Sequence, residues 1–545
     1  MRSLNHKSLP RAVAAQEKLL PFLLDRRSYP HKPRRVRMVR THASFVFIAP
    51  PYVFKMKKAV NLGFLDFSTL EKRRHFCERE VELNRRLCAD VYLGVVRITR
   101  KDGQFVFNGD GVAADYAVKM RLLSKGGFLK ANLKRDEVQR HDLNRIARVL
   151  QKFYQTHPPA KEVLHWGRID RLRLSTDENF RQTRRFIGRT ISRQADEAIR
   201  AFTNQFYARH ARVFAARVRE QRIRDCHGDL RSEHVHLTPD ALHIIDCIEF
   251  NDRFRYVDVA NDIAFLAMDL DSAGRPDLAR HFVAAMAKAL EDEGMLRLMD
   301  FYKCYRAYVR GKVESLRSAD AATDEEAKRA GHRARRYFRL ALNYAVAGSR
   351  PMVLAVVGRV GSGKSHFARA LGEALGWPVF SSDRVRKELA GVPANQRSDA
   401  AIRHRLYSTS MTRRTYAALV KAAEHQFASG RGVILDATFG GRAQREQLQK
   451  RFARGDVALH FLEMQANDAT IRRWLAQRNV TNAEASDARL EDFAMLAKSY
   501  QAPDELTPRD LTVVQSRLPP AQQLRQALAA LAVRRVNDVV DVSKG

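Results

Sequence analysis

The sequence predicts a chain of two parts: an α+β part in which a strand-rich lobe precedes a helical lobe, and an α/β part built on a parallel sheet. Three observations support this. Short apolar runs separated by turn residues fill residues 31–125, helical patterns dominate residues 126–347, and strands and helices alternate over residues 348–530. At 545 residues, the chain is also too long for a single hydrophobic core.

The composition is that of a soluble globular protein with an excess of basic residues. Hydrophobic residues make up 45% and charged residues 29% of the chain, and 97 Lys and Arg against 61 Asp and Glu give a net charge of +36. This charge indicates either a polyanionic partner such as nucleic acid or a solvated basic surface, and no nucleic-acid-binding motif decides between them. The five cysteines include no C-x-x-C pair, and no apolar run approaches the length of a membrane span. We therefore expect a cytoplasmic protein without a membrane span.

The first predicted domain covers residues 31–347 and follows an N-terminal extension, residues 1–30. Its small lobe, residues 31–125, contains runs of β-branched and aromatic residues bounded by turn signals, and one charged amphipathic helix over residues 69–87. The helical lobe, residues 126–347, is interrupted by short apolar strands and loops within residues 220–250. The strands predicted in the small lobe are residues 44–48, 52–57, 95–99, 104–108 and 116–123.

A pair of aspartates marks the first predicted active site. Asp229 follows His227 and Gly228 on a predicted loop, and Asp246 ends a short apolar strand. In phosphoryl transfer, one carboxylate orients or deprotonates a hydroxyl nucleophile and the other holds Mg²⁺ against the nucleotide phosphates. Carboxylates suit the second role because Mg²⁺ is a hard ion that prefers oxygen ligands. We predict a catalytic role for Asp229 and a metal-binding role for Asp246.

A lysine in the small lobe completes this first site. Lys55 lies in the predicted strand 52–57, where a lysine can pair with the α- and β-phosphates of ATP and is braced by a glutamate of a helix. Glu80 in the predicted helix is our choice for that glutamate, with Glu78 and Glu82 as alternatives.

The second predicted domain, residues 348–530, contains the most specific motif of the chain. Residues 358–365 match G-x-x-x-x-G-K-[ST] at every fixed position, after an apolar strand and before a helical pattern. Backbone N–H groups of such a loop surround phosphates, the lysine reaches the β- and γ-phosphates, and the final hydroxyl can bind Mg²⁺. The predicted nucleotide-binding residues are Gly358, Gly361, Ser362, Gly363, Lys364 and Ser365, with Ser365 also a metal ligand.

Three further residues of this domain are predicted to act with the loop. Asp383 ends the second predicted strand and can accept the proton of a substrate hydroxyl. Asp436 ends the third and is the expected second carboxylate of the Mg²⁺ site. Arg478, in a predicted lid helix, is placed to contact the γ-phosphate, where charge spreads in the transition state. The predicted strands are residues 352–357, 378–381, 432–435 and 457–462, and residues 531–545 form a predicted C-terminal tail.

These motifs resemble a known family. His227, Asp229 and Asp246 resemble the aminoglycoside phosphotransferase branch of the protein-kinase-like fold, and residues 63–73 (GFLDFSTLEKR) resemble bacterial two-part proteins that join such a domain to a P-loop kinase. These proteins are described as bifunctional aminoglycoside phosphotransferase/ATP-binding proteins, and the resemblance extends over residues 30–530. It implies ATP and Mg²⁺ as cofactors. The chain departs from the resembled pattern at His234, where the fold commonly has an asparagine that binds a metal ion.

The expected function is transfer of the γ-phosphate of ATP to a hydroxyl of a small molecule by the P-loop half, with a second kinase-like site in the N-terminal half. Two alternatives stay open. The chain can be a nucleotide-gated binding protein whose N-terminal half is a pseudokinase, which His234 favours. It can also be a 5′-hydroxyl polynucleotide kinase, which the net charge favours.

Overall fold

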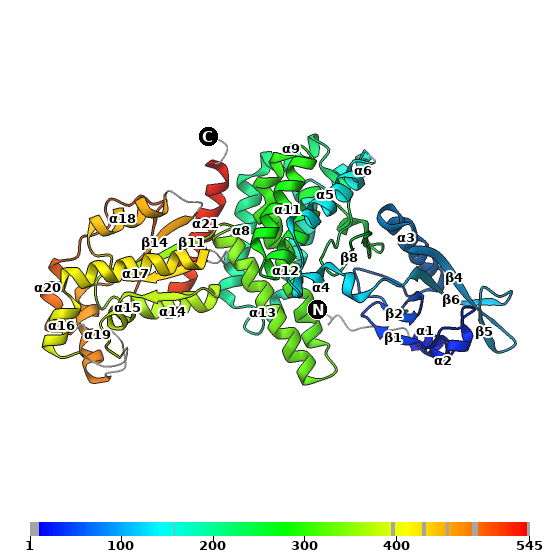
Figure 1. Cartoon of the computed structure of the whole chain (residues 1–545), viewed down its shortest axis with the longest axis horizontal. Helices are drawn as coiled ribbons and strands as arrows, with labels where there is room; N and C mark the ends of the chain where they lie inside the picture. The colour runs from blue at the N-terminus through cyan, green and yellow to red at the C-terminus, as the bar shows by residue number, and fades with distance from the viewer. Residues whose placement is uncertain are drawn as a thin grey trace. The chain divides into compact units, whose positions relative to one another are not determined.

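The computed structural model describes residues 10–156, 158–393, 398–427, 432–453, 457–481 and 489–541 (Figure 1). The chain divides into two compact units. The first comprises Met1–Leu172 and Arg212–Leu296, and the second comprises Arg173–Ala211 and Arg297–Gly545.

The first unit contains a six-stranded sheet in the order β1-β2-β3-β6-β4-β5, with every neighbouring pair antiparallel. The five strands predicted in the small lobe are all present. The edge strand β1 was not predicted, because its four residues, Arg-Met-Val-Arg, are largely exposed and lack an apolar run. The strands are β1 (Arg37–Arg40), β2 (Ser44–Ala49), β3 (Tyr52–Lys57), β4 (Tyr92–Lys101), β5 (Gln104–Phe107) and β6 (Val112–Arg121).

Helix α3 (Leu70–Cys88) packs against β4 and β6 and carries the predicted glutamate toward the sheet. Its first turn is capped by Thr69, whose hydroxyl accepts a hydrogen bond from the Lys72 N–H. The short helices α1 (Pro10–Glu17) and α2 (Leu20–Leu24) lie beside the sheet, and Leu23 of α2 is buried in the same core as strand residues. The N-terminal extension therefore contributes to the core of the small lobe.

The rest of the first unit is helical, with two short β-ladders that hold the loops of the first predicted site. Strand β7 (Ile223–Asp225) pairs with β10 (Tyr256–Asp258), and β8 (Val235–Leu237) pairs with β9 (Leu242–Ile244). The helices are α4 (Leu129–Lys134), α5 (Arg140–Gln155), α6 (Lys161–His165), α9 (Ala211–Arg219), α10 (Val259–Ser272) and α11 (Pro276–Ala289); α7 (Ile169–Thr183) runs from this unit into the second.

The second unit contains a five-stranded sheet in the order β12-β13-β11-β14-β15, in which all neighbours are parallel. This confirms the predicted α/β class of the C-terminal part. The edge strand β15 was not predicted, because its short apolar run is only partly buried and follows a polar segment. The strands are β11 (Met352–Val357), β12 (Val379–Ser381), β13 (Val433–Asp436), β14 (Ala458–Gln465) and β15 (Leu511–Gln515).

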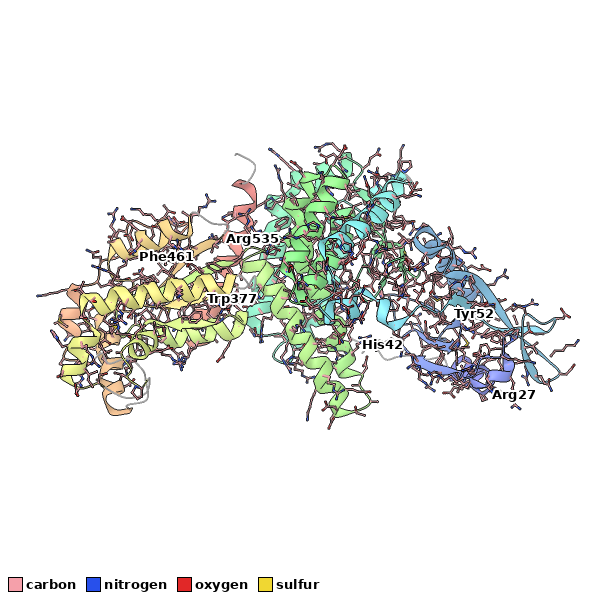
Figure 2. All side chains as sticks on the ribbon, viewed as in Figure 1. Arg27, His42, Tyr52, Trp377, Phe461 and Arg535 are labelled. Carbon is pink, nitrogen blue, oxygen red and sulfur yellow. The ribbon has the colours of Figure 1, made fainter. Side chains whose placement is uncertain are left out.

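Helices cover both faces of this sheet. On one face, α17 and α18 close a core that includes Val353, Val433 and Phe461, the last of which is labelled in Figure 2. On the other face, α14 contacts β11, β12 and β13, and α21 contacts β15. The helices are α14 (Lys364–Leu375), α15 (Ser382–Leu389), α16 (Ala400–Leu406), α17 (Thr409–Phe427), α18 (Arg442–Phe452), α19 (Asp468–Thr481), α20 (Phe493–Lys498) and α21 (Pro520–Asp541).

Three helices of the predicted first domain belong to this second compact unit: α8 (Arg193–Arg209), α12 (Met299–Ala319) and α13 (Asp324–Val346). Helix α21 packs along α8, where Arg525 pairs with Glu197 at 2.8 Å. The buried ring of His210 lies 3.1 Å from the Val536 carbonyl, so the last helix is tied to this bundle along its length. The domain boundaries drawn from the sequence stay a prediction.

Among the described residues, no helix combines the length and the apolar character that crossing a membrane requires.

Candidate active sites

Lys55 is the centre of an ion-pair network in the first unit. Its Nζ lies 2.9 Å from Oε1 of Glu80 and 2.6 Å from Oδ1 of Asp246. The other two glutamates considered from the sequence face elsewhere: Glu78 pairs with Arg74 and Glu82 pairs with Arg79. The structure therefore brings the predicted lysine of β3, the glutamate of α3 and the second aspartate together.

A second lysine, Lys57, shares this network and was missed from the sequence. Its Nζ lies 2.8 Å from Oε2 of Glu80 and also pairs with Glu249. Lys57 and Glu80 are completely buried. Residues two apart on a strand point to the same face, so the pattern Lys-Met-Lys in β3 was the available signal.

The charges of this network lower the pKa of Asp246 but not that of Glu249. Burial alone would raise the pKa of Asp246, but the nearby Lys55 ammonium and the His234 ring outweigh burial and hold that pKa well below its usual range. For Lys55, burial would lower the pKa, yet Asp246 and Glu80 raise it well above normal. Burial dominates at Glu249 and raises its pKa. Asp246 thus presents a carboxylate, and it is only partly shielded from solvent.

The loop that carries Asp229 is fixed by buried hydrogen bonds. The N–H groups of His227 and Gly228 donate to the two carboxylate oxygens of Asp262, at 2.9 and 3.0 Å. Gly228 has φ +84°, and a Cβ there would meet the Phe254 carbonyl oxygen at 2.8 Å. The ring of His227 lies 2.9 Å from the Ile245 carbonyl, which joins this loop to the segment leading to Asp246.

Asp229, His234 and Asp246 converge at the end of this loop. Nδ1 of His234 lies 2.8 Å from the carbonyl oxygen of Asp229, and its Nε2 lies 3.5 Å from Oδ2 of Asp246. Asp246 itself has φ +66°, a left-handed conformation that is uncommon outside glycine and occurs frequently at functional sites. Arg231, which the sequence analysis did not single out, donates to both oxygens of Asp229 at 2.8 Å.

The glycine-rich loop of the second unit connects β11 to the N-terminus of α14. Gly358 and Gly363 have φ +137° and +90°, which an L-residue with a side chain rarely adopts. Lys364 and Ser365 begin α14, so the first N–H groups of the helix and the loop face the same region. A helix N-terminus with free N–H groups attracts anions, and this arrangement can hold phosphates.

Asp436 lies opposite this loop at the end of β13. It pairs in register with Val356 of β11 and Ser381 of β12, so three strand ends meet at one edge of the sheet. Burial raises the pKa of Asp436, against the lowering effects of the Lys364 charge and of hydrogen bonds from the Ser365 and Ser381 hydroxyls. The structure thus joins the two residues predicted to bind the metal, Ser365 and Asp436.

Asp383 lies in the first turn of α15, directly after β12, and its charge acts on Asp436. It is partly exposed, as an acceptor of a substrate proton must be. Arg386 of the same helix is buried and donates to the Leu406 carbonyl at 2.9 Å. Its neighbour Arg384 is exposed.

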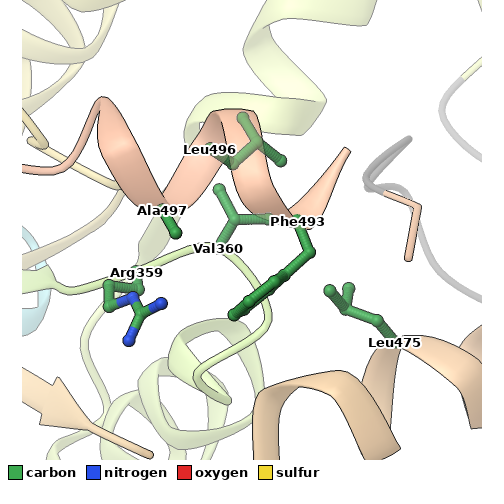
Figure 3. A pocket seen from close by; sticks show the side chains of 6 residues that line it. All are labelled: Arg359, Val360, Leu475, Phe493, Leu496 and Ala497. Atoms are coloured by element: carbon green, nitrogen blue, oxygen red, sulfur yellow. The ribbon is translucent and has the colours of Figure 1, made fainter. Parts of the chain in front are cut away.

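The predicted lid helix is α19, and it packs onto the glycine-rich loop. Arg359 of the loop pairs with Asp468 at 2.6 Å. Arg359 and Arg472 both lie over the ring of Phe493. The backbone of Arg478 lies in α19, but its side chain is outside the described residues. A small hollow beside the loop is lined by Arg359, Val360, Leu475, Phe493, Leu496 and Ala497 (Figure 3).

Both sites have donors that fit Mg²⁺. In the second unit, the Ser365 hydroxyl is close enough to Asp436 to affect its pKa, and both side chains offer oxygen donors of the kind this ion prefers. In the first unit, the ionised Asp246 carboxylate would hold the ion.

Comparison with known proteins agrees with this division into two kinase-like parts. Residues 118–302 match the family model described as "Phosphotransferase enzyme family", and residues 353–503 match the one described as "AAA domain". By fold and by these matches, the chain joins an N-terminal part like the phosphotransferase enzyme family to a C-terminal part that contains a P-loop AAA-type domain.

Two mycobacterial proteins resemble the chain over most of its length. The uncharacterized proteins Rv2004c of Mycobacterium tuberculosis and Mb2027c of Mycobacterium bovis are each 32% identical over 458 residues, which cover 84% of this chain and 88% of theirs. The chain belongs to the family of these proteins.

Solved structures resemble separate parts of the chain. A gluconokinase from Sinorhizobium meliloti is 21% identical, with 35% of this chain and 98% of that chain covered and a TM-score of 0.26. A choline/ethanolamine kinase family protein from Mesorhizobium loti is 11% identical, with 60% and 99% covered and a TM-score of 0.36.

Proposed function

We propose that the P-loop half of this protein transfers the γ-phosphate of ATP to a hydroxyl group of a small molecule. The observation that carries this proposal is that the glycine-rich loop follows β11 and that Asp436 ends the adjoining strand β13, in register with Val356. The Lys364 charge and the Ser365 hydroxyl are close enough to Asp436 to act against the burial that raises its pKa. A phosphate-binding loop, a lysine and a metal-binding pair then meet at the carboxyl ends of parallel strands. Ligands bind at this place in open α/β sheets.

Each residue has a distinct task in the proposed reaction. The N–H groups at the start of α14 and the Lys364 ammonium bind and orient the phosphates. Bound Mg²⁺ would neutralise charge on the β- and γ-phosphates, held by Ser365 and Asp436. Asp383 accepts the proton of the acceptor hydroxyl. Arg478 of α19 contacts the γ-phosphate and stabilises the charge that develops during transfer.

A second candidate function is phosphoryl transfer at the N-terminal site. The contacts of Lys55 with Glu80 and Asp246, and the position of Asp229 beside Asp246 through His234, favour it. Here Lys55 binds phosphate, Asp246 holds the metal and Asp229 accepts the proton of a second acceptor.

The acceptor is proposed to be a small molecule, and the basic surface offers a further contact for polyanions, including nucleic acid. A 5′-hydroxyl polynucleotide end is the alternative acceptor that the charge favours. We place the reaction in the cytoplasm, because the five cysteines are free and buried, as in proteins of reducing compartments.

The test is transfer of the labelled γ-phosphate of ATP into a cytosolic extract, with products separated into small molecules, nucleic acid and protein. Lys364→Ala should lower the labelling of the P-loop product by about a hundredfold or more, the usual effect of removing one group that stabilises transition-state charge. Lys421→Ala, at an exposed position of α17, is the matched control and should label normally. Undiminished labelling by a Lys364→Ala, Asp229→Ala double variant would refute the assignment.

A further inference from the structure

Arg231 occupies an unusual place in the N-terminal site. Its guanidinium donates two hydrogen bonds of 2.8 Å to the Asp229 carboxylate and also pairs with Glu233. Only a tenth of its side chain is exposed, so it is a fixed part of the loop. Burial would lower its pKa, but Asp229 and Glu233 raise it, and a guanidinium stays charged under all relevant conditions. A permanent positive charge is therefore built in beside the predicted catalytic carboxylate.

His234 stands at the position where the resembled fold commonly binds a metal ion, and it lies next to Arg231. The Asp229 carbonyl can only accept a hydrogen bond, so Nδ1 of His234 must carry the proton that it donates there, over 2.8 Å. The other ring nitrogen, Nε2, lies 3.3 Å from the Arg231 guanidinium and 3.5 Å from Oδ2 of Asp246. The position that holds a metal-binding asparagine in the resembled fold thus carries an imidazole that lies against a cation of the protein.

Two effects disfavour a second metal ion at this place. Imidazole is a poor ligand for Mg²⁺, which prefers oxygen donors. The Arg231 guanidinium would also repel a divalent ion at His234, because both are positive and share the same small set of carboxylates. Asp246 is different: Lys55 contacts its Oδ1 only, and its carboxylate is partly exposed.

We propose that the N-terminal site uses a single divalent ion, held by Asp246, and that the guanidinium of Arg231 takes the place and the charge role of a second ion. This inference rests on the proposed second phosphotransfer site and specifies how that site neutralises phosphate charge. Arg231 and Lys55 then supply fixed positive charge at Asp229 and Asp246 respectively.

The test counts manganese ions bound with a non-hydrolysable ATP analogue. The full chain carries Lys364→Ala and Ser365→Ala to remove the phosphate and metal contacts of the P-loop. Equilibrium dialysis gives bound nucleotide, and electron paramagnetic resonance gives free Mn²⁺. Values from the same chain with Asp246→Ala are subtracted. We expect one Mn²⁺ per bound nucleotide. Arg231→Ala should raise this to two, because Asp229, Glu233 and His234 then lose their shared cation.

Two further variants keep the test decisive. Arg135→Ala removes an exposed ion pair with Glu137 and should leave the count at one. If Arg231→Ala does not fold, His234→Asn restores an amide oxygen while keeping the guanidinium, and its count should also stay at one.

The proposal is overturned by two ions in the parent chain, by two ions in His234→Asn, or by one ion in a folded Arg231→Ala. Absence of nucleotide binding that depends on Asp246 would overturn it as well. That last result would leave the proposal for the P-loop half intact, because labelling by the unmodified chain tests that half separately.

Discussion

At the residue scale, Glu80 connects two lysines of one strand to one helix. Both of its oxygens are engaged, one by Lys55 and one by Lys57, and no part of the side chain reaches solvent. Burial would raise its pKa, but the two ammonium groups lower it overall. Glu80 therefore both sets the position of the phosphate-binding lysine and neutralises a lysine that has no access to water.

Glu80→Gln should strongly destabilise the small lobe. Removing one partner of a buried ion pair leaves an uncompensated charge, which typically costs about 3–5 kcal/mol. We expect a clear fall in the temperature of the first thermal unfolding transition, followed by circular dichroism. Glu78→Gln is the matched control on the same helix, since Glu78 pairs with Arg74 at the surface and should leave the transition nearly unchanged. Equal effects of the two variants would contradict the proposed role of the buried network.

Arg231 illustrates the same principle in the catalytic loop. In our proposal, this one arginine pairs with the surrounding carboxylates, which would otherwise be able to bind a second metal ion. Its closeness to Asp229 follows from their separation of two residues, but its contact with His234 depends on the turn between them.

At the element scale, the order of the parallel sheet positions the P-loop site. Strand β11 is central, with β13 on one side and β14 on the other, and β12 lies beyond β13. The chain runs from β11 to β12 on one side and from the neighbouring β13 to β14 on the other, and such a switch point opens a crevice at the carboxyl ends of these strands. The glycine-rich loop, Asp383 and Asp436 all follow strands that end there.

A buried histidine makes the stability of this sheet depend on pH. His460 of β14 is completely buried, and its Nε2 lies 2.9 Å from the Thr512 hydroxyl of β15. Burial, with a smaller effect of the Arg534 charge, lowers its pKa from 6.5 to about 3. Between these two values the unfolded chain binds a proton that the folded chain does not. The contribution of the neutral His460 to the free energy of unfolding is therefore complete above pH 6.5 and is lost progressively as the pH falls below that value.

We expect the free energy of unfolding of the second unit to fall by about 2 kcal/mol between pH 7 and pH 5 because of His460. The fall is about 1.4 kcal/mol for each pH unit below 6.5. The measurement is thermal unfolding of the chain at both pH values. His460→Gln should reduce the difference between them, while His425→Gln, at an exposed position of α17, should not. A pH effect that is the same in His460→Gln and the unmodified chain would show that another group causes it.

At the scale of the whole molecule, each compact unit carries one predicted site. Lys55, Asp229 and Asp246 lie in the first unit, and Lys364, Asp383 and Asp436 lie in the second. The residues proposed for two separate phosphoryl transfers therefore lie in different units, whereas the net charge of +36 belongs to the chain as a whole.

We expect two active sites to give two labelled products, each of which is lost when its own site is mutated. In the labelling assay, Asp229→Ala should remove one labelled product and Lys364→Ala a different one, because each variant disables one site. Product identity is followed by chromatography of the labelled fractions. If Lys364→Ala removes all label and Asp229→Ala removes none, the N-terminal half is a pseudokinase and the alternative of a nucleotide-gated protein gains support for that half.

The sequence by itself determined the features that are encoded locally. The glycine-rich loop needs eight consecutive residues, and the strands of both sheets follow from short apolar runs, so these could be predicted. The edge strands β1 and β15 could not, because a half-exposed strand has a weak hydrophobic pattern.

Only the tertiary structure decided which charged groups meet. Lys55 and Asp246 are 191 residues apart, and Lys57 and Glu249 are 192 apart, so no local pattern shows that these groups pair. The choice of Glu80 over Glu78 and Glu82, the contact of Arg231 with His234, and the inclusion of α8, α12 and α13 in the unit of the P-loop sheet have the same origin. Each depends on the folding of distant segments or on the path of a turn, because burial and ion pairing are properties of the packed chain.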